Sequence, residues 1–443
     1  MFRFTPFHSV LLLSLYFAQG FPAGLVAHVL PPLMRENGLP LEYIGFIKML
    51  ALPWVLKFLW APWVDKTNVG GWGQHRGWIL TMIAWSMLML GLMALVSPRQ
   101  LMASTGLAVN GSGYFPYLML GLFFILILGL NLGASTQDIA TDGLAVKLLP
   151  PPMRGWGNAL QVGGYKVGMI VCSSLLLMSI DLVGWPVSMG LMVVVMSCCL
   201  LPVLFFNEAR TFPPANTSEA DAVSGPVALP LKTYLGFLHQ PGIAWWVALL
   251  LLFKLPDSLA SGMIKPLLVD VGLSLTEIGS ITLLSSLVGV AAVFAGGGFY
   301  DRLGPRMCLI SMALLQAASL ASISLIAVGN MPMSGLLALT MFEQLVDSMS
   351  TVALFAVMMH YCRETHEGAD YSLQACIQVL FAGLASVLSG VFAAWLGYQW
   401  LFYLAGLISV AVAFLAYVHF SVSPKALTEW EEIRRRKEDQ GFA

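Results

Sequence analysis

The chain has 443 residues, of which 58% are hydrophobic and only 10% are charged. A soluble globular domain carries about 25% charged residues, so this composition excludes an ordinary soluble protein. The formal net charge of −1 at pH 7 gives no indication of a nucleic-acid partner. The lipid bilayer is therefore the expected surrounding of this protein.

Long apolar runs recur along the whole chain. Because about 20 apolar residues in a helix cross the hydrocarbon core of a bilayer, we predict an all-α integral membrane protein with twelve transmembrane helices. The predicted spans are 9–31, 43–64, 78–97, 115–149, 157–180, 185–206, 243–265, 277–299, 307–328, 334–361, 372–395 and 400–421.

The first apolar run is long and does not end in a small-residue cleavage site. We therefore interpret it as a retained helix rather than as a signal peptide. Most Lys and Arg residues in the loops fall on one side of the membrane when the N-terminus is placed in the cytoplasm. Because positive charge favours the cytoplasmic side, we predict that both termini are cytoplasmic.

The composition changes between the sixth and seventh predicted spans. Residues 213–226 are polar, rich in Pro and without hydrophobic periodicity, which is typical of a linker. We therefore predict an N-terminal six-helix half (1–206), a cytoplasmic linker (207–242), a C-terminal six-helix half (243–421) and a cytoplasmic tail (422–443).

The fourth predicted span carries Gln137, Asp138 and Asp142 in an otherwise apolar run. Residues at i and i+4 share a helix face, so the two carboxylates point the same way. Carboxylates at membrane depth are costly unless they face water or a partner. We predict that this face handles substrate or protons. Asp142, nearer the cytoplasm, could instead form a gating or packing ion pair with Arg154 or Lys166.

The second half repeats this pattern. Glu343, Gln344 and Asp347 lie in the tenth span, and the two acids follow Asp138 and Asp142 at the same separation along the chain. The seventh span carries Lys254 and Asp257 on either side of a proline. Two matching halves with polar mid-membrane positions are typical of transporters built from repeats. We therefore add these residues to the candidate substrate or proton site.

Further polar side chains within the spans are candidates for the same site. They are Gln19, Gln161, Tyr165, Lys166 and Gln378. A hydrogen bond between helices is an equal alternative for Gln19. Lys57, in the second span, either lines the cavity or extends toward the cytoplasmic headgroups. Lysines in a cavity would suit an anionic substrate.

Three acids, Glu364, Glu367 and Asp370, lie in the predicted cytoplasmic loop before the eleventh span. Charged residues in such a loop are mostly exposed. We therefore predict that these three carboxylates form a solvated face.

The segment from Gly297 to Arg306 has the pattern Gly-x3-Asp-Arg-x-Gly-x-Arg. It resembles the loop motif that follows an even-numbered helix in the major facilitator superfamily. The resemblance implies a loop-end Asp and basic residues that latch the cytoplasmic side. The gate residues that it indicates here are Asp65, Arg76, Arg154, Asp301, Arg302 and Arg306. The first-half copy departs from the pattern, because a longer insert follows Asp65.

A narrower resemblance rests on short motifs in spans two to five. These are Lys57-Phe-Leu-Trp-Ala-Pro-x-x-Asp65, Arg76-Gly-Trp78, Gln137-Asp138-Ile139-x-x-Asp142, Arg154-Gly-x-Gly157 and Gly164-Tyr-Lys-x-Gly168. They resemble the branch of AmpG muropeptide permeases and acetyl-CoA transporters, and the fourth and fifth spans look most like RhtX/FptX siderophore permeases. The branch implies inward transport of a large polar ligand across a bacterial inner membrane.

We therefore expect a monomeric, multi-pass inner-membrane secondary transporter that works by alternating access and is coupled to protons. The resemblance makes a siderophore or ferric siderophore the expected substrate, with a muropeptide as the alternative. A non-transporting accessory protein is a further alternative. No nucleophile–base constellation or metal-ligand spacing appears in the sequence, and the six cysteines fit packing roles. We therefore expect neither an enzyme nor a cofactor.

Overall fold

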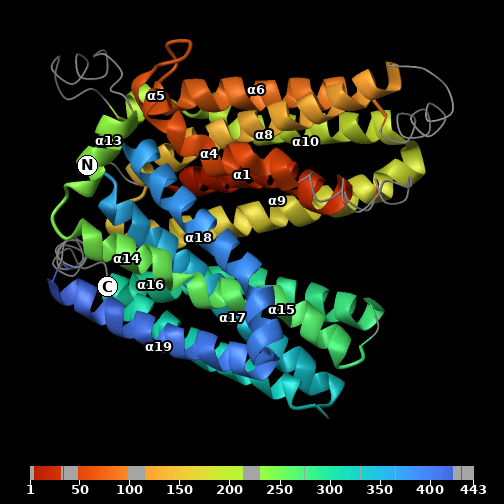
Figure 1. Cartoon of the computed structure of the whole chain (residues 1–443). Helices are drawn as coiled ribbons and strands as arrows, with labels where there is room; N and C mark the ends of the chain where they lie inside the picture. Colours follow the sequence, from red (N-terminus) through yellow and green to blue (C-terminus); the bar gives the residue numbers. More distant parts are fainter. Residues whose placement is uncertain are drawn as a thin grey trace. The chain divides into compact units, whose positions relative to one another are not determined.

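The structure is a computed structural model, and it describes residues 4–30, 33, 48–97, 115–212, 230–273, 275–329, 331–364, 366–422 and 431. Within these ranges every regular element is a helix (Figure 1). The chain divides into two compact units. Unit 1 comprises Met1–Leu148, Gly163–Pro230 and Glu364–Ser372, and unit 2 comprises Leu149–Val162, Leu231–Arg363 and Leu373–Ala443.

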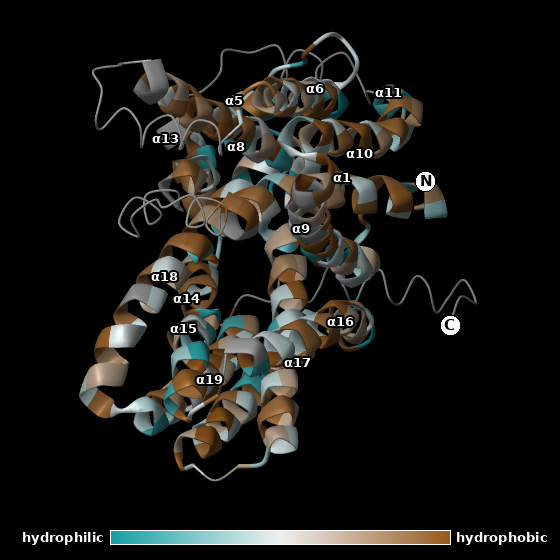
Figure 2. Cartoon of the chain, turned by 90° about the vertical axis from the view of Figure 1, so that its right-hand side faces the viewer, coloured by the Kyte–Doolittle hydropathy of each residue, from teal (hydrophilic) through white to brown (hydrophobic). Residues whose placement is uncertain are grey.

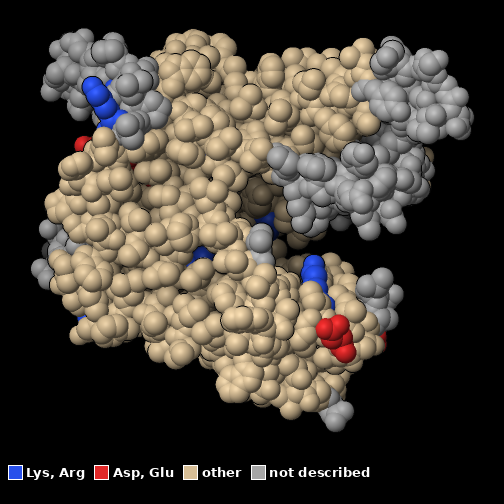
Figure 3. Space-filling model, viewed as in Figure 1, with Lys and Arg blue, Asp and Glu red and all other residues tan. Residues whose placement is uncertain are grey.

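Nine stretches of the described chain are long and apolar enough to cross a membrane. One of them, Glu277–Ala327, contains two predicted spans, which are separated where Gly304 leaves the helical conformation with φ of 77°. The first two predicted spans lie partly outside the described ranges. Apolar residues dominate the long helices (Figure 2), and few charged side chains reach the face shown in Figure 3. An all-helical membrane fold is thus confirmed, while twelve spans and cytoplasmic termini stay predictions.

The helices of unit 1 begin with α1 and include the start of α18. In chain order they are α1 (Pro6–Gly24), the π-helical turn η1 (Leu25–Val29), η2 (Lys48–Ala51), α4 (Leu52–Leu56), η3 (Lys57–Leu59), α5 (Ala61–Lys66), α6 (Gln74–Ala94), α8 (Phe115–Leu148), the part of α9 (Arg154–Val183) after Val162, α10 (Trp185–Phe205), α11 (Glu208–Thr211) and α18 (Glu367–Leu396) as far as Ser372.

The second predicted span is interrupted where the structure describes it. Four short helical pieces run from Lys48 to Lys66 instead of one continuous helix. Pro53 and Pro62 stand in the first turns of α4 and α5. Proline is tolerated in the first turn of a helix but cannot donate the hydrogen bond that continues a preceding one. The interruption places Lys57 at a break in the helix.

Glycines bring α1 and α9 into close contact within unit 1. A Cβ atom on Gly168 would lie 2.1 Å from the carbonyl oxygen of Phe17, and one on Gly20 would lie 2.4 Å from the carbonyl oxygen of Tyr165. Small residues let membrane helices approach to backbone contact. This packing holds α1 against the part of α9 around Tyr165.

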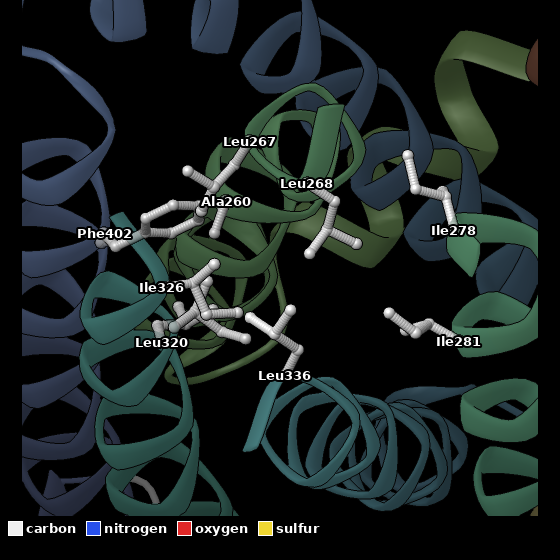
Figure 4. Close-up of a cluster of buried hydrophobic side chains, with 11 residues drawn as sticks. Ala260, Leu267, Leu268, Ile278, Ile281, Leu320, Ile326, Leu336 and Phe402 are labelled. Atoms are coloured by element: carbon white, nitrogen blue, oxygen red, sulfur yellow. The ribbon is translucent and has the colours of Figure 1, made fainter. Parts of the chain in front are cut away.

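The helices of unit 2 begin with the short turn before α9. They are η4 (Pro151–Met153), the start of α9, α13 (Pro230–Leu238), α14 (Ile243–Phe253), α15 (Leu255–Asp270), α16 (Leu275–Ala327), α17 (Met333–Met358), η5 (Met359–Tyr361), α18 (Glu367–Leu396) beyond Ser372, and α19 (Tyr398–Val422). An apolar cluster that includes Leu267, Leu320, Leu336 and Phe402 joins α15, α16, α17 and α19 (Figure 4).

The predicted linker contains helical residues at both of its ends. α11 begins at Glu208, and α13 occupies Pro230–Leu238. The Pro-rich stretch 213–229 between them lies outside the described residues. The division into an N-terminal half, linker and C-terminal half therefore remains a prediction.

Candidate substrate and proton site

Lys57 is the centre of a buried charge cluster in unit 1. It begins η3, at the interruption between α4 and α5, and only 4% of its surface is exposed. Its ammonium group forms an ion pair with Asp138, and its Nζ atom lies 3.7 Å from Oδ2 of Asp142. One lysine therefore contacts both acids of α8. The sequence left open whether Lys57 lines the cavity or extends toward the headgroups. Its burial favours the position in the cavity.

Further hydrogen bonds hold this cluster in place. The hydroxyl of Tyr16 on α1 donates to Oδ1 of Asp142 at 2.9 Å. On either side of Lys57, the indole nitrogen of Trp54 donates to Asn131 at 3.0 Å and that of Trp60 donates to Thr136 at 3.1 Å. These two donors, spaced three residues before and after Lys57, anchor the broken second span along α8.

Several buried polar atoms close to this cluster in sequence have no hydrogen-bond partner among the described residues. They are Nε2 of Gln137, Oγ1 of Thr141 and Nε2 of Gln19. Gln137 and Thr141 immediately precede the two acids of α8, and Gln19 lies one turn after Tyr16 on α1. A buried polar group without a partner costs about 1–3 kcal/mol. A ligand that offers acceptors to these amides would recover that cost.

Lys254 is the centre of the corresponding cluster in unit 2. It occupies the break between α14 and α15, and it is buried. Its Nζ atom lies 2.6 Å from Oδ1 of Asp347, 2.8 Å from Oγ of Ser350 and 3.9 Å from Oδ2 of Asp257. As in unit 1, a lysine at a helix interruption contacts two aspartates.

A third acid, Glu343, belongs to the unit 2 cluster. It lies one turn before Asp347 on α17 and is only 3% exposed. Its Oε2 atom accepts a hydrogen bond from Nε2 of Gln344 at 3.0 Å, and its Oε1 atom has no partner within the described parts of the chain. The repeated acidic pairs of the sequence thus each meet a buried lysine of their own unit.

The other candidates of the spans lie less centrally. Tyr165 is close enough to Asp138 and Lys57 for their charges to act on its hydroxyl. Lys166 and Gln378 are half-buried, and Gln161 is buried in the part of α9 that belongs to unit 2.

Two of the predicted gate acids cap helices. Asp65 accepts hydrogen bonds from the backbone N–H groups of Gly368 at 3.2 Å and Ala369 at 2.6 Å, at the start of α18. Asp301 accepts two such bonds of 2.9 Å from the first turn of α9, donated by Gly155 and Trp156. Free N–H groups and the helix dipole make a helix N-terminus attractive to a carboxylate. Asp65 has the same role as Asp301 despite the insert that follows it.

Asp65 lies in an acidic environment. Burial is the largest influence and raises its pKa to about 8, while the hydrogen bond from Ala369 opposes this and the charge of Glu367 adds to it. Lys147 lies 3.8 Å from Oε1 of Glu367 and supplies positive charge nearby.

The predicted solvated face before α18 is wrong for two of its three acids. Glu364 is exposed, but Glu367 is 5% exposed and Asp370 is fully buried. The loop is short, and α18 begins at Glu367. The first turn of α18 therefore takes these carboxylates into unit 1, where Asp65 caps it.

A third carboxylate, which the sequence did not single out, caps the start of α6. Glu208 accepts backbone hydrogen bonds from His75 at 3.1 Å and Arg76 at 2.9 Å, and its Oε1 lies 2.8 Å from Nδ1 of His75. Burial alone would raise the pKa of Glu208, but the contacts with His75 and Arg76 outweigh it and lower the pKa. The guanidinium of Arg76 donates to the carbonyl oxygens of Val203 and Leu204 at the end of α10.

The remaining predicted gate residues are basic. Arg154 begins α9 and is buried, and Arg302 is exposed. The guanidinium carbon of Arg306 lies 5.0 Å from the ring centre of Tyr417, which is a cation–π contact.

Sequence reasoning missed Tyr16 and Glu208 as functional candidates. Tyr16 lies within an apolar run and Glu208 directly follows one, and this position was the only indication of a role. The sequence did not show that Tyr16 contacts Asp142 or that Glu208 contacts His75. Within the described residues, no group of three or more His, Cys, Asp or Glu side chains could hold a metal ion.

Comparison with known proteins shows which sequence families and which fold this chain resembles. Residues 8–183 match the sequence model of the family described as Acetyl-coenzyme A transporter 1, and residues 255–437 match that of the Major Facilitator Superfamily. The solved structure of the Escherichia coli fucose:proton symporter has a TM-score of 0.69 at 16% identity, covering 94% of this chain and 99% of that one. The chain has the major facilitator fold.

A second solved structure is similar to this chain over almost its whole length. A bacterial homologue of the iron transporter ferroportin, in an outward-facing state, has a TM-score of 0.64 at 15% identity and covers 94% of this chain and 100% of its own. At this identity the likeness concerns the fold alone.

Curated relatives narrow the family within the major facilitator fold. The chain is 28% identical to the anhydromuropeptide permease of Escherichia coli K12 over 378 residues, which are 84% of this chain and 71% of the relative. It is 21% identical to the putative transporter AmpG 4 of Rickettsia conorii over 405 residues, 90% and 92% of the two chains. These relatives support the AmpG-type resemblance but not the predicted closeness to siderophore permeases. Fold and relatives together indicate a transporter.

Proposed function

We propose that this protein is a secondary transporter that imports an anhydromuropeptide-type solute across a bacterial inner membrane by alternating access. The observation that carries this proposal is the pair of buried lysine–aspartate clusters, one in each unit and each at a helix interruption. Interrupted helices with polar mid-membrane groups are typical of transporter substrate and ion sites. The names of the AmpG-type relatives supply the solute class.

The chemistry of unit 1 fits such a solute. A muropeptide carries hydroxyl, amide and carboxylate groups, all of which accept hydrogen bonds. The unpartnered amides of Gln19 and Gln137 can donate to such acceptors. The ammonium of Lys57, now held by Asp138, is positioned to attract a carboxylate. We therefore assign substrate recognition to the face formed by α1, the broken second span and α8.

We assign the gate to the helix caps at the end of the molecule that the charge distribution predicts to be cytoplasmic. The carboxylates of Asp65 and Asp301 fix the first turns of α18 and α9. Each of these helices starts in one unit and continues in the other. The caps therefore hold the first turns of two helices whose chain passes from one unit into the other.

The test is counterflow in proteoliposomes. Purified protein is reconstituted with unlabelled anhydromuropeptide inside, and entry of a trace of labelled anhydromuropeptide from outside is followed against protein-free liposomes. We expect a transient accumulation of label without any imposed ion gradient. Absence of counterflow for the muropeptide, together with counterflow for a ferric siderophore, would replace the proposed solute with the siderophore that the span motifs suggested. Absence of both would leave the accessory-protein alternative.

A further inference from the structure

The charge balance of the two clusters differs. In unit 2 the carboxyls of Asp257, Glu343 and Asp347 surround the single ammonium of Lys254. In unit 1, the ion pairs described for Lys57 are with two carboxylates, those of Asp138 and Asp142. Uncompensated negative charge in a buried site is costly, so the unit 2 cluster has the stronger demand for an added positive charge.

The unpartnered atoms of the two clusters differ in the same sense. In unit 1, Asp142 accepts from Tyr16 and Asp138 is paired with Lys57, whereas Gln137 leaves an amide nitrogen without an acceptor. Among the residues described, the unpartnered atoms of unit 2 include the acceptor Oε1 of Glu343 and the donor Nε2 of Gln316. Within the cluster around Lys254, Oε1 of Glu343 is therefore an acceptor that a proton can occupy.

The polar and charged groups described around Glu343 include two acids, a lysine and a glutamine of its own cluster. Asp257 and Lys254 face it from the α14–α15 break, and Asp347 and Gln344 face it from α17. Lys254 is already engaged by Asp347, at 2.6 Å. The ammonium therefore compensates an aspartate, and the charge of Glu343 is left to repel the same acids.

The geometry points to Glu343 as the residue that binds and releases the coupled proton, in a buried site that it forms with Lys254, Asp257 and Asp347. This inference rests on the proposed transport function and adds the place of the proton to it. Loading adds one proton from water to Oε1 of Glu343 and converts the carboxylate to the acid. Release returns that proton to water on the other side, and no other bond forms or breaks.

Asp347 is more exposed to solvent than Glu343. The Asp347 side chain is 22% exposed, whereas Glu343 as a whole is 3% exposed. The more exposed aspartate, one turn away on the same helix, is the natural point of entry for the proton. In unit 1, Asp138 is paired with Lys57, and we assign it to recognition of the solute.

The experiment separates exchange from gradient-driven uptake. Parent protein, Glu343→Gln and Asp138→Asn are reconstituted, and labelled anhydromuropeptide is followed both in counterflow at several pH values and under an imposed inward proton gradient. In Glu343→Gln we expect gradient-driven accumulation to fall to the level of protein-free liposomes, while counterflow persists and no longer varies with pH. In Asp138→Asn we expect counterflow itself to weaken.

Asp270→Asn is the matched control. Asp270 is an exposed acid of α15 in the same unit, where it accepts a hydrogen bond from Tyr398 at 2.7 Å. Its variant should behave as the parent in both assays. The inference is overturned if Glu343→Gln still accumulates solute under the proton gradient, or if a sodium gradient drives the parent instead. If the parent shows no counterflow, the proposed solute has failed rather than the proton site.

An infrared measurement decides the proton site without any solute. A buried protonated carboxyl has a carbonyl stretching band distinct from that of a carboxylate. In purified protein at neutral pH we expect a component of this band that is lost in Glu343→Gln and kept in Asp138→Asn and Asp270→Asn. An unchanged band in Glu343→Gln would overturn the inference whatever the transported solute is.

Discussion

Glu208 and His75 are 133 residues apart in the chain, yet Oε1 of the first lies 2.8 Å from Nδ1 of the second. The same carboxylate accepts the backbone N–H groups that begin α6. A single acid thus fixes the imidazole and the N-terminus of a membrane helix together. Asp65 and Asp301 accept backbone N–H groups in the first turns of α18 and α9, so three helices start at a carboxylate from a distant segment.

Replacing Glu208 should weaken the start of α6. In Glu208→Gln the charge at the helix N-terminus is lost while the shape is kept, and an N-terminal anion contributes about 1–2 kcal/mol in partly buried sites. We expect a lower thermal unfolding midpoint in detergent at neutral pH. Glu364→Gln, at an exposed acid, should leave the midpoint unchanged. Equal midpoints for the two variants would contradict a capping role for Glu208.

The caps at Asp65 and Glu208 should have opposite pH dependence. Because burial raises the pKa of folded Asp65 to about 8, the folded chain keeps a proton that the unfolded chain loses near pH 4. The free energy of unfolding therefore decreases as pH rises from about 4 to about 8. The folded pKa of Glu208 is lowered, so its contribution is present above its unfolded value and is lost as pH falls through the folded value.

Unfolding curves measured at several pH values test these two opposite changes in the free energy of unfolding. Asp65→Asn should remove part of the decline toward alkaline pH, and Glu208→Gln should remove part of the decline toward acid. Asp270→Asn is the control for loss of an aspartate charge. If the Asp65→Asn and parent curves run parallel from acid to alkaline pH, the raised pKa of Asp65 is wrong.

Removing Lys57 alone should be more damaging than removing it with a partner. Lys57→Met leaves the buried carboxylates of Asp138 and Asp142 without their shared cation, and breaking a buried ion pair in this way costs about 3–5 kcal/mol. The double variant Lys57→Met/Asp138→Asn should recover part of this loss. Thermal unfolding in detergent measures both. A double variant that is less stable than the single one would exclude Asp138 as the principal partner of Lys57.

The contact between α1 and α9 should not tolerate a methyl group. Gly168→Ala places a Cβ where the carbonyl oxygen of Phe17 would lie 2.1 Å away, and overpacking of this kind costs about 1–3 kcal/mol. Gly190→Ala on α10 is the control, because in the described part of the chain no atom beyond the adjacent backbone of α10 lies within 4 Å of its Cβ position. There the helix propensity of alanine should hold or slightly raise the unfolding midpoint. Folded yield and midpoint in detergent distinguish the two.

Much of the helical architecture could be predicted from the sequence. Hydrophobic run length decides which segments span a bilayer, and that depends on local composition alone. The loop motif also located Asp65 and Asp301 at helix ends. The sequence did not show that these two acids accept hydrogen bonds from Gly368 and Gly155. Which helix N-terminus lies against each loop depends on how the whole chain folds.

The candidate clusters were predicted in part. The i,i+4 spacing singled out Asp138 with Asp142 and Glu343 with Asp347, because one helix face follows from periodicity. For Asp142 the sequence suggested Arg154 or Lys166 as an ionic partner, whereas Lys57 contacts both acids of α8 in the structure. Lys57 lies between Pro53 and Pro62, where the second span is interrupted. The burial of Asp370 was also out of reach, because the capping acid that draws it inward lies hundreds of residues earlier.

The cap between Asp65 and Gly368 spans 303 residues of chain, and this has a consequence for biosynthesis. Unit 1 needs Glu364–Ser372, which leave the ribosome after most of unit 2 has been made. Asp65 must therefore remain hydrated at the membrane surface while helices of the other unit are inserted. The first unit is the first to begin folding and among the last to be completed, so the N-terminal portion synthesised alone would lack the segment that closes it.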